Sequence, residues 1–153
     1  KMEAFEIERK FLVKKLPEDL EKYECRQLEQ GYLCTEPVVR IRRSDDTYTL
    51  TYKGKGLLVR EEYNLPLTKE AYEHLKPKAD GILITKKRYK IPYQSYMIEL
   101  DIFEGELASS QLAEVEFPTK EEAEAFEAPE WFGEDVTFSG QYQNSSLSKR
   151  KKK

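Results

Sequence analysis

The chain has 153 residues, which suffices for one domain with a sizeable core. Its charged fraction of 36% exceeds the roughly 25% that is usual, yet 26 lysines and arginines nearly balance 29 aspartates and glutamates, for a net charge of −3. This balance argues against a general nucleic-acid binder, so a function of the charge must lie in its local arrangement. No apolar run approaches the roughly 20 residues of a membrane span, which predicts a cytoplasmic protein without a membrane partner.

The cysteines and the single histidine exclude two further kinds of site. Cys25 and Cys34 are too far apart for a CxxC pair, and with His74 alone they form no zinc-binding cluster, so we expect reduced thiols. The chain shows no internal linker or repeat. We therefore expect one domain over residues 1–148 and a basic, disordered tail at 149–153.

The first extended segment, residues 6–10, reads Glu-Ile-Glu-Arg-Lys. Because side chains alternate along a strand, Glu6, Glu8 and Lys10 share one face, while Ile7 lies on the other. One interpretation is the half-solvated strand of an antiparallel sheet, and the other is the wall of a polar interior. Repetition of the pattern in other strands, with complementary charges, favours the second.

The segment that follows carries weaker signals. A short helical turn is expected at residues 16–20, where a proline occupies an early position. Residues 25–34 are compatible with a helix or a strand. The alternation of Leu28, Gln30 and Tyr32 favours the strand.

Three strands with one cationic face are predicted next. Residues 38–43 form the first, residues 44–47 are typical of a turn, and residues 48–55 return as the second strand of a hairpin. Residues 57–65 form the third. The cationic residues on the ionic faces of these three strands are Arg40, Arg42, Lys53, Lys55 and Arg60.

Two short helices are predicted farther along the chain. Thr68 is a suitable N-cap for a helix that runs toward Lys78 and is shortened by Pro77. Residues 119–122 form a capping box, which starts the second helix. A short extended piece is expected at residues 136–138.

Three more strands are predicted at residues 82–89, 96–103 and 112–117. The register of the first is open, because Lys87 lies on the face opposite to its charged neighbours. The charged residues that these strands add are Lys86, Arg88, Glu99, Asp101, Glu114 and Glu116.

The apolar faces of these strands need cover, and two or three short helices cannot cover a flat sheet. An open sheet with all ionic faces in solvent is physically possible. Each surface ion pair in it would contribute only roughly 0–1 kcal/mol of stability. A closed, strongly curved antiparallel sheet solves the problem by packing helices outside and turning the ionic faces inward around a wet channel. We therefore expect an α+β fold built on a closed barrel.

The inward charges divide into two groups with different chemistry. The acidic group suits a hard divalent cation such as Mg²⁺ or Mn²⁺, and the basic group suits a chain of phosphates. A metal beside clustered arginines and lysines is what phosphoryl transfer requires, and no side-chain nucleophile is evident, so water is expected to attack directly. The acidic group is Glu6, Glu8, Asp101, Glu114 and Glu116, and the basic group is Lys10, Arg40, Arg42, Lys53, Lys55, Arg60, Lys86 and Arg88.

These motifs, in this order, resemble the CYTH superfamily, the triphosphate tunnel metalloenzymes. The ExExK signature is residues 6–10, and the agreement continues through residues 40–42, 53–55, 60–62, 86–88, 99–101 and 114–116, over nearly the whole chain. The resemblance implies an antiparallel barrel of about eight strands that forms a polar tunnel, with triphosphate held by the basic residues and metal by the acidic ones.

The resemblance also implies individual roles. Glu8, Lys10 and Arg42 are expected to be catalytic, and Tyr32 matches the tyrosine that related hydrolases place with the ExExK lysine near the attacking water. Lys55 is expected among the phosphate ligands, although the glycine turn before it could swing it outward.

Among family members the chain is most similar to the small bacterial tripolyphosphatases. The expected activity is metal-dependent hydrolysis of tripolyphosphate, with nucleoside triphosphates and longer polyphosphates as lesser substrates. Thiamine triphosphatases usually carry a tryptophan after the Lys-x-Arg segment, where this chain has Tyr89. The alternatives are an adenylate cyclase and a noncatalytic polyphosphate-binding module.

Overall fold

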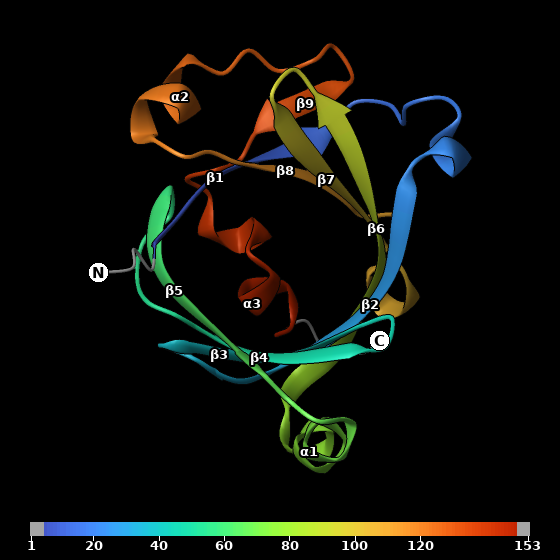
Figure 1. Ribbon diagram of the computed structural model, residues 1–153, viewed down its shortest axis with the longest axis vertical. Helices are drawn as coiled ribbons and strands as arrows, with labels where there is room; N and C mark the ends of the chain where they lie inside the picture. The colour runs from blue at the N-terminus through green and yellow to red at the C-terminus, as the bar shows by residue number, and fades with distance from the viewer. Residues whose placement is uncertain (1–4, 150–153) are drawn as a thin grey trace.

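The computed structural model describes residues 5–149, so nearly all of the predicted tail lies outside the described residues. Nine strands form one antiparallel sheet that curls into a barrel (Figure 1). The strands are β1 (Phe5–Val13), β2 (Glu24–Thr35), β3 (Val38–Ser44), β4 (Thr47–Lys53), β5 (Val59–Pro66), β6 (Asp80–Tyr93), β7 (Tyr96–Phe103), β8 (Gln111–Glu116) and β9 (Phe132–Asp135).

Strand β1 closes the barrel by changing partners along its length. Its start pairs with β5 through Phe5 opposite Glu61, and its middle pairs with β8 through Glu8 opposite Glu116. Its end also pairs with β9, which adds a short strand beside the closed ring. The closed antiparallel barrel of about eight strands is confirmed, and closure leaves few unpaired edges.

Two helices lie outside the barrel, as expected. Helix α1 (Lys69–Leu75) begins at Thr68, whose hydroxyl accepts from the Ala71 N–H, and it buries Tyr72 completely. Helix α2 (Lys120–Ala125) covers the opposite side and begins at the predicted capping box (Figure 1).

A third helix, α3 (Asn144–Leu147), lies inside the barrel, which corrects the expectation that all helices pack outside (Figure 1). The reason is the apolar lining of this end of the barrel. Leu147 packs there with a buried cluster that includes Tyr32, Ile84 and Phe103. Helix α3 therefore fills one part of the interior and leaves the ionic part open.

Several boundaries differ from the prediction. The helical turn after β1 comes later than expected, as a 3-10 turn at Leu20–Lys22, and β4 ends at Lys53. The last extended piece is β9 rather than residues 136–138, although the Val136 N–H still donates to the Lys10 carbonyl at 2.8 Å. No helix in the described part of the chain is long and apolar enough to cross a membrane.

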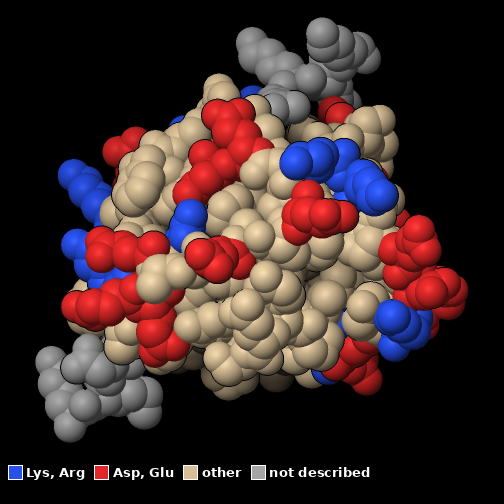
Figure 2. Space-filling model, turned by 90° about the horizontal axis from the view of Figure 1, so that it is seen from above, with Lys and Arg blue, Asp and Glu red and all other residues tan. Residues whose placement is uncertain are grey.

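The outer face seen in Figure 2 carries acidic and basic side chains interspersed with uncharged residues. On that face no broad region of a single charge is visible. Inside the barrel, by contrast, side chains of like charge lie together, because the inward positions of the strands converge there.

Candidate active site

One cavity of about 220 Å³ lies inside the barrel, between the ionic positions of the strands and helix α3. Its walls come from segments far apart in the sequence, because neighbouring strands present their inward side chains at one level. The predicted site residues that line it are Glu6, Glu8, Lys10, Tyr32, Arg40, Arg42, Lys53, Arg60, Arg88, Glu99, Glu114 and Glu116.

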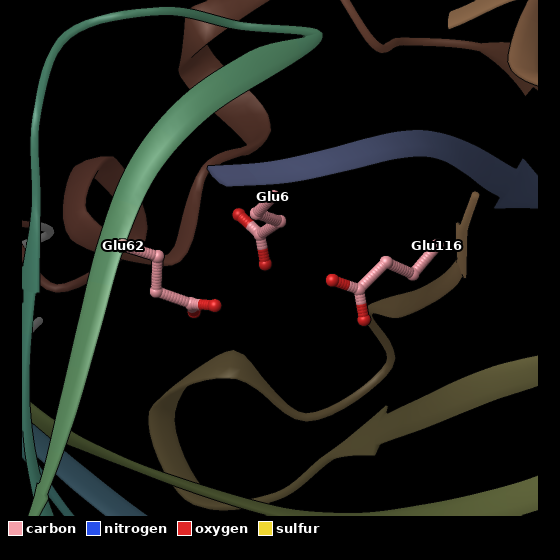
Figure 3. A group of neighbouring side chains, drawn as sticks. All are labelled: Glu6, Glu62 and Glu116. Atoms are coloured by element: carbon pink, nitrogen blue, oxygen red, sulfur yellow. The ribbon is translucent and has the colours of Figure 1, made fainter. Parts of the chain in front are cut away.

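Three carboxylates gather on one side of the cavity: Glu6 from β1, Glu62 from β5 and Glu116 from β8 (Figure 3). One oxygen of each lies within 4.8 Å of the others. Ligand oxygens on opposite sides of an octahedral Mg²⁺ are about 4.2 Å apart, so a small inward movement would bring all three onto one cation. These residues fit a hard divalent metal ion.

Electrostatics supports this interpretation of the acidic group, which we define as Glu6, Glu8, Glu62 and Glu116. Burial, and after it the charges of Glu6 and Glu62, raises the pKa of Glu116 to about 7. Burial together with the charges of Glu114 and Glu6 also raises the pKa of Glu8 well above its usual value. A divalent cation would relieve this repulsion.

Lys53 supplies the positive charge next to this group. Its Nζ lies 3.1 Å from Glu6 Oε1 and 3.7 Å from Glu62 Oε2. A cation bound by these carboxylates would compete with the Lys53 ammonium for the same oxygens.

Sequence reasoning missed Glu62, although the signal was available. Arg60, Glu62 and Asn64 alternate along β5 and so share one face of the strand, and all three line the cavity. The side chain of Arg60 donates to the Gly54 carbonyl at 3.1 and 3.2 Å and so holds the turn after β4.

Opposite the acidic group lies a cationic wall, which we define as Arg40, Arg42 and Arg88. Burial, and then the charges of Arg40 and Arg88, lowers the pKa of Arg42 to about 9, which still leaves it charged at neutral pH. The Arg40 Nε is buried and has no hydrogen-bond partner among the described residues. An unpartnered guanidinium nitrogen is costly. Because this atom is closed to solvent, the Arg40 side chain would have to shift before an anionic oxygen in the cavity could satisfy it.

Glu114 lines the cavity but differs from the other acidic residues in its partners. Its carboxylate lies 3.2 Å from Lys10 Nζ and 3.3 Å from Arg88 Nη2. Burial would raise its pKa, but the attraction of Lys10 and Arg88 outweighs burial and lowers it. Glu99 is likewise paired with Arg88, at 3.2 Å. Glu114 and Glu99 therefore have close cationic partners, although the charge of Glu114 also acts on Glu8 and that of Glu99 on Glu116.

Asp101 and Lys86 are not among the residues that line the cavity. Both are completely buried, with Lys86 Nζ 2.7 Å from Asp101 Oδ2, and Arg88 donates to both oxygens of Asp101 at 2.8 Å. The structure therefore does not bring Asp101 together with the other predicted metal ligands that line the cavity. It also does not bring Lys86 together with the predicted phosphate ligands there. The alternation identified the inward face of each strand correctly. It could not show which inward side chains line the cavity and which are buried away from it.

Lys55 also lies outside the cavity lining. It is exposed in the turn after β4, in agreement with the outward swing that the glycine before it allows. Lys87 is exposed too, which resolves the register of β6 in favour of Lys86 and Arg88 facing inward.

Tyr32 and Lys10 complete the cavity on the side of helix α3. Tyr32 is 3% exposed, and its hydroxyl oxygen accepts from Gln30 Nε2 at 3.2 Å. Lys10 Nζ donates to the Tyr142 carbonyl at 3.3 Å. Burial opposes the charge of Lys10, but Glu114 and Glu8 more than compensate and raise its pKa, so its ammonium stays charged.

A closed antiparallel barrel with carboxylates facing arginines across one interior cavity has the architecture of the triphosphate tunnel proteins that the motifs resemble. The CYTH domain matches residues 4–152, and the chain belongs to the CYTH family.

Named relatives agree with this assignment. The chain is 39% identical to an inorganic triphosphatase of Nitrosomonas europaea, over 94% of this chain and 96% of the relative. It is 35% identical to an inorganic triphosphatase of Acetivibrio thermocellus, over 78% of each. The crystal structure of an inorganic triphosphatase superimposes with a TM-score of 0.71 at 36% identity, covering 95% of both chains.

Proposed function

We propose that the protein is a divalent-metal-dependent hydrolase of inorganic tripolyphosphate. The observation that carries the proposal is the acidic group facing the cationic wall across one cavity. The relatives that are named inorganic triphosphatases support the choice of substrate. Nucleoside triphosphates and longer polyphosphates are proposed as lesser substrates, because they carry the same chain of phosphates.

The acidic group would hold the metal ion, which we propose to be Mg²⁺ or Mn²⁺, since both prefer oxygen ligands. When bound, such an ion supplies charge neutralisation for the phosphates and polarises the phosphoryl group. Glu6, Glu62 and Glu116 are the proposed ligands, and Glu8 supports them from the same side of the cavity.

The cationic wall binds the phosphate oxygens. Arginine presents its N–H groups in a fork that matches two oxygens at once, so Arg40, Arg42 and Arg88 fix the position of the substrate. Lys10 adds a point charge beside the terminal phosphate. Because binding and charge stabilisation supply most of the catalysis in phosphoryl transfer, no covalent intermediate is required.

Hydrolysis then proceeds by direct attack of water on a terminal phosphorus. The new P–O bond forms as the bridging P–O bond breaks, and the products are phosphate and pyrophosphate. Lys10 and Tyr32 line the part of the cavity next to helix α3, and we place the terminal phosphate and the attacking water there. A reducing, cytoplasmic location is part of the proposal, in keeping with free cysteines at Cys25 and Cys34.

Phosphate release from tripolyphosphate, measured with Mg²⁺, with Mn²⁺ and with chelator, tests the proposal. The wild-type protein should turn over only with metal, and Glu8→Ala and Arg42→Ala should abolish turnover while circular dichroism shows an intact fold. Lys87→Ala, on the outward face of β6, is the matched control and should retain full activity. A metal-dependent rate equal to the blank would support a noncatalytic binding module, and formation of cyclic AMP from ATP would support a cyclase.

A further inference from the structure

Gln30 is a completely buried amide on the inner face of β2, directly behind the cavity wall. A buried amide is costly unless it is fully hydrogen-bonded. Gln30 contacts three residues that line the cavity: its Oε1 accepts from Arg42 Nε at 2.9 Å, and its Nε2 donates to Tyr32 at 3.2 Å and to Asn144 Oδ1 at 3.1 Å. No role in the proposed reaction has yet been assigned to it.

The orientation of this amide is fixed from both ends. The Nε of Arg42 can only donate, so the oxygen of Gln30 must face it and the nitrogen must face Tyr32 and Asn144. Lys86 Nζ, which also can only donate, lies 2.8 Å from Asn144 Oδ1. Asn144 therefore presents its oxygen to Gln30, which demands the same orientation of the Gln30 amide.

This orientation determines what the Tyr32 hydroxyl can do. Because Gln30 donates to the phenolic oxygen, the hydroxyl proton cannot point at Gln30 and must be donated elsewhere. Tyr32 lines the cavity, and its hydroxyl donates to no other protein group among the described residues. The free direction for the proton is the cavity.

We propose that Gln30 is a positioning residue that holds Tyr32 as a hydrogen-bond donor toward an oxygen of the bound triphosphate. The inference rests on the proposed function for its choice of substrate. Gln30 also touches Arg42, so the Gln30–Arg42 bond keeps the donor and the neighbouring guanidinium at a fixed spacing. A donor preorganised in this way stabilises the negative charge of phosphoryl transfer.

Gln30→Glu tests the inference, because it keeps the size of the side chain and the acceptor for Arg42 while it removes the donor to Tyr32. The Tyr32 hydroxyl would then donate to the introduced carboxylate and no longer to the substrate. We expect kcat for tripolyphosphate to fall about a hundredfold, as when one donor of an oxyanion site is lost. Tyr32→Phe should cause a similar loss, and the double variant should be no slower than Tyr32→Phe alone.

The double-mutant cycle separates this role from a structural one. If Gln30→Glu slows the Tyr32→Phe protein as much as it slows the wild type, Gln30 does not act through Tyr32 and the inference is overturned. Should Gln30→Glu fail to fold, Gln30→Met completes the cycle without a buried charge. Because methionine also removes the acceptor for Arg42, we expect a smaller loss in the Tyr32→Phe background than in the wild type, and equal losses in the two backgrounds would overturn the inference. Gln27→Met, at an exposed position of the same strand, is the control and should leave kcat unchanged.

The same cycle on the Kd for tripolyphosphate, measured by calorimetry with Ca²⁺, keeps the two proposals distinguishable. A wild-type protein that releases no phosphate but shows coupled losses of affinity at Gln30 and Tyr32 would overturn the proposed hydrolysis and leave the positioning role intact. Active wild-type protein with additive effects on both kcat and Kd would overturn the positioning role alone.

Discussion

The interior of the barrel contains two sets of carboxylates in opposite electrostatic environments. Asp101 and Glu114 lie against cations, and Arg88 and Lys86 or Lys10 occupy their oxygens. The acidic group, by contrast, consists of carboxylates that face one another, with Lys53 as a nearby ammonium. Glu114 and Glu116 lie only two residues apart on β8, yet the first has cationic partners and the second faces other carboxylates.

The pKa values express this contrast. Burial alone would raise the pKa of both kinds of carboxyl, but Arg88 and Lys86 lower that of Asp101. In the acidic group, burial and like charges act together and raise the pKa of Glu8 and of Glu116. Paired carboxylates hold arginines and lysines in place, whereas repelling carboxylates carry a cost that a bound cation relieves.

The largest expected effect tests the paired set through stability. Asp101→Asn leaves the buried Lys86 without its acidic partner and removes the two-oxygen partner of Arg88, which keeps only Glu99 and Glu114. Breaking one partner of a buried ion pair costs about 3–5 kcal/mol of the free energy of unfolding, which urea denaturation at pH 7 measures.

Glu116→Gln is the control for this prediction, since it removes a charge from the repelling set. It should leave the free energy of unfolding of the metal-free protein unchanged or raise it. Equal destabilisation by both substitutions would erase the distinction between the two sets.

The next effect tests the acidic group through metal binding. Glu62→Gln removes a proposed ligand, whereas Glu61→Gln changes the neighbouring carboxylate on the outer face of β5. We expect the Mn²⁺ concentration for half-maximal activity to rise about a hundredfold for Glu62→Gln, at least as much as when an outer-shell partner of a metal ligand is lost. Glu61→Gln should match the wild type, and an equal response of the two variants would remove Glu62 from the metal site.

Much of the barrel was predictable because a strand reports its two faces directly in the sequence. The alternation around Glu6 and Glu8, Arg40 and Arg42, and Arg88 placed these side chains inward, where the structure finds them. The family resemblance then supplied the closure and the approximate number of strands.

The depth of each inward residue was not predictable. Asp101 and Lys86 have the same alternation as the cavity-lining residues, yet they are buried and do not line the cavity. Lys86 donates to Asn144 of helix α3, whose four residues are too few to show a helical periodicity in the sequence. The place of this helix inside the barrel is set by the apolar pocket around Leu147, which forms only when distant strands come together.

A pH dependence of metal binding sharpens the contrast further. Because the pKa of Glu116 in the metal-free protein is about 7, a cation must displace a proton from this carboxyl at lower pH. One such proton weakens metal affinity about tenfold between pH 8 and pH 6, by the linkage between protonation and binding. Calorimetric titration with Mn²⁺ at the two pH values, without substrate, measures the difference.

Glu116→Gln provides the matched comparison for this experiment. Its affinity should be weaker at pH 8 but should change less between the two pH values, because the proton with the raised pKa is gone. A wild-type affinity that stays constant from pH 8 to pH 6 would contradict the assignment of Glu116 as a repelled, metal-binding carboxylate.

The smallest expected effect concerns Lys53, a cation that contacts two carboxylates of the acidic group. Its ammonium neutralises Glu6 and Glu62 in part, so a metal ion must weaken these contacts to bind. Ion pairs that retain some solvent exposure contribute up to about 1 kcal/mol, so Lys53→Met should tighten Mn²⁺ binding in the absence of substrate by up to about fivefold. For tripolyphosphate the effect should be opposite, and Lys53→Met should raise KM. The reason is that the metal ion releases Lys53 from the carboxylates, so that its ammonium can contact the phosphates. If Lys53→Met weakened metal binding instead, the lysine would be organising the carboxylates rather than competing for them, and the acidic group would depend on pairing as much as Asp101 does.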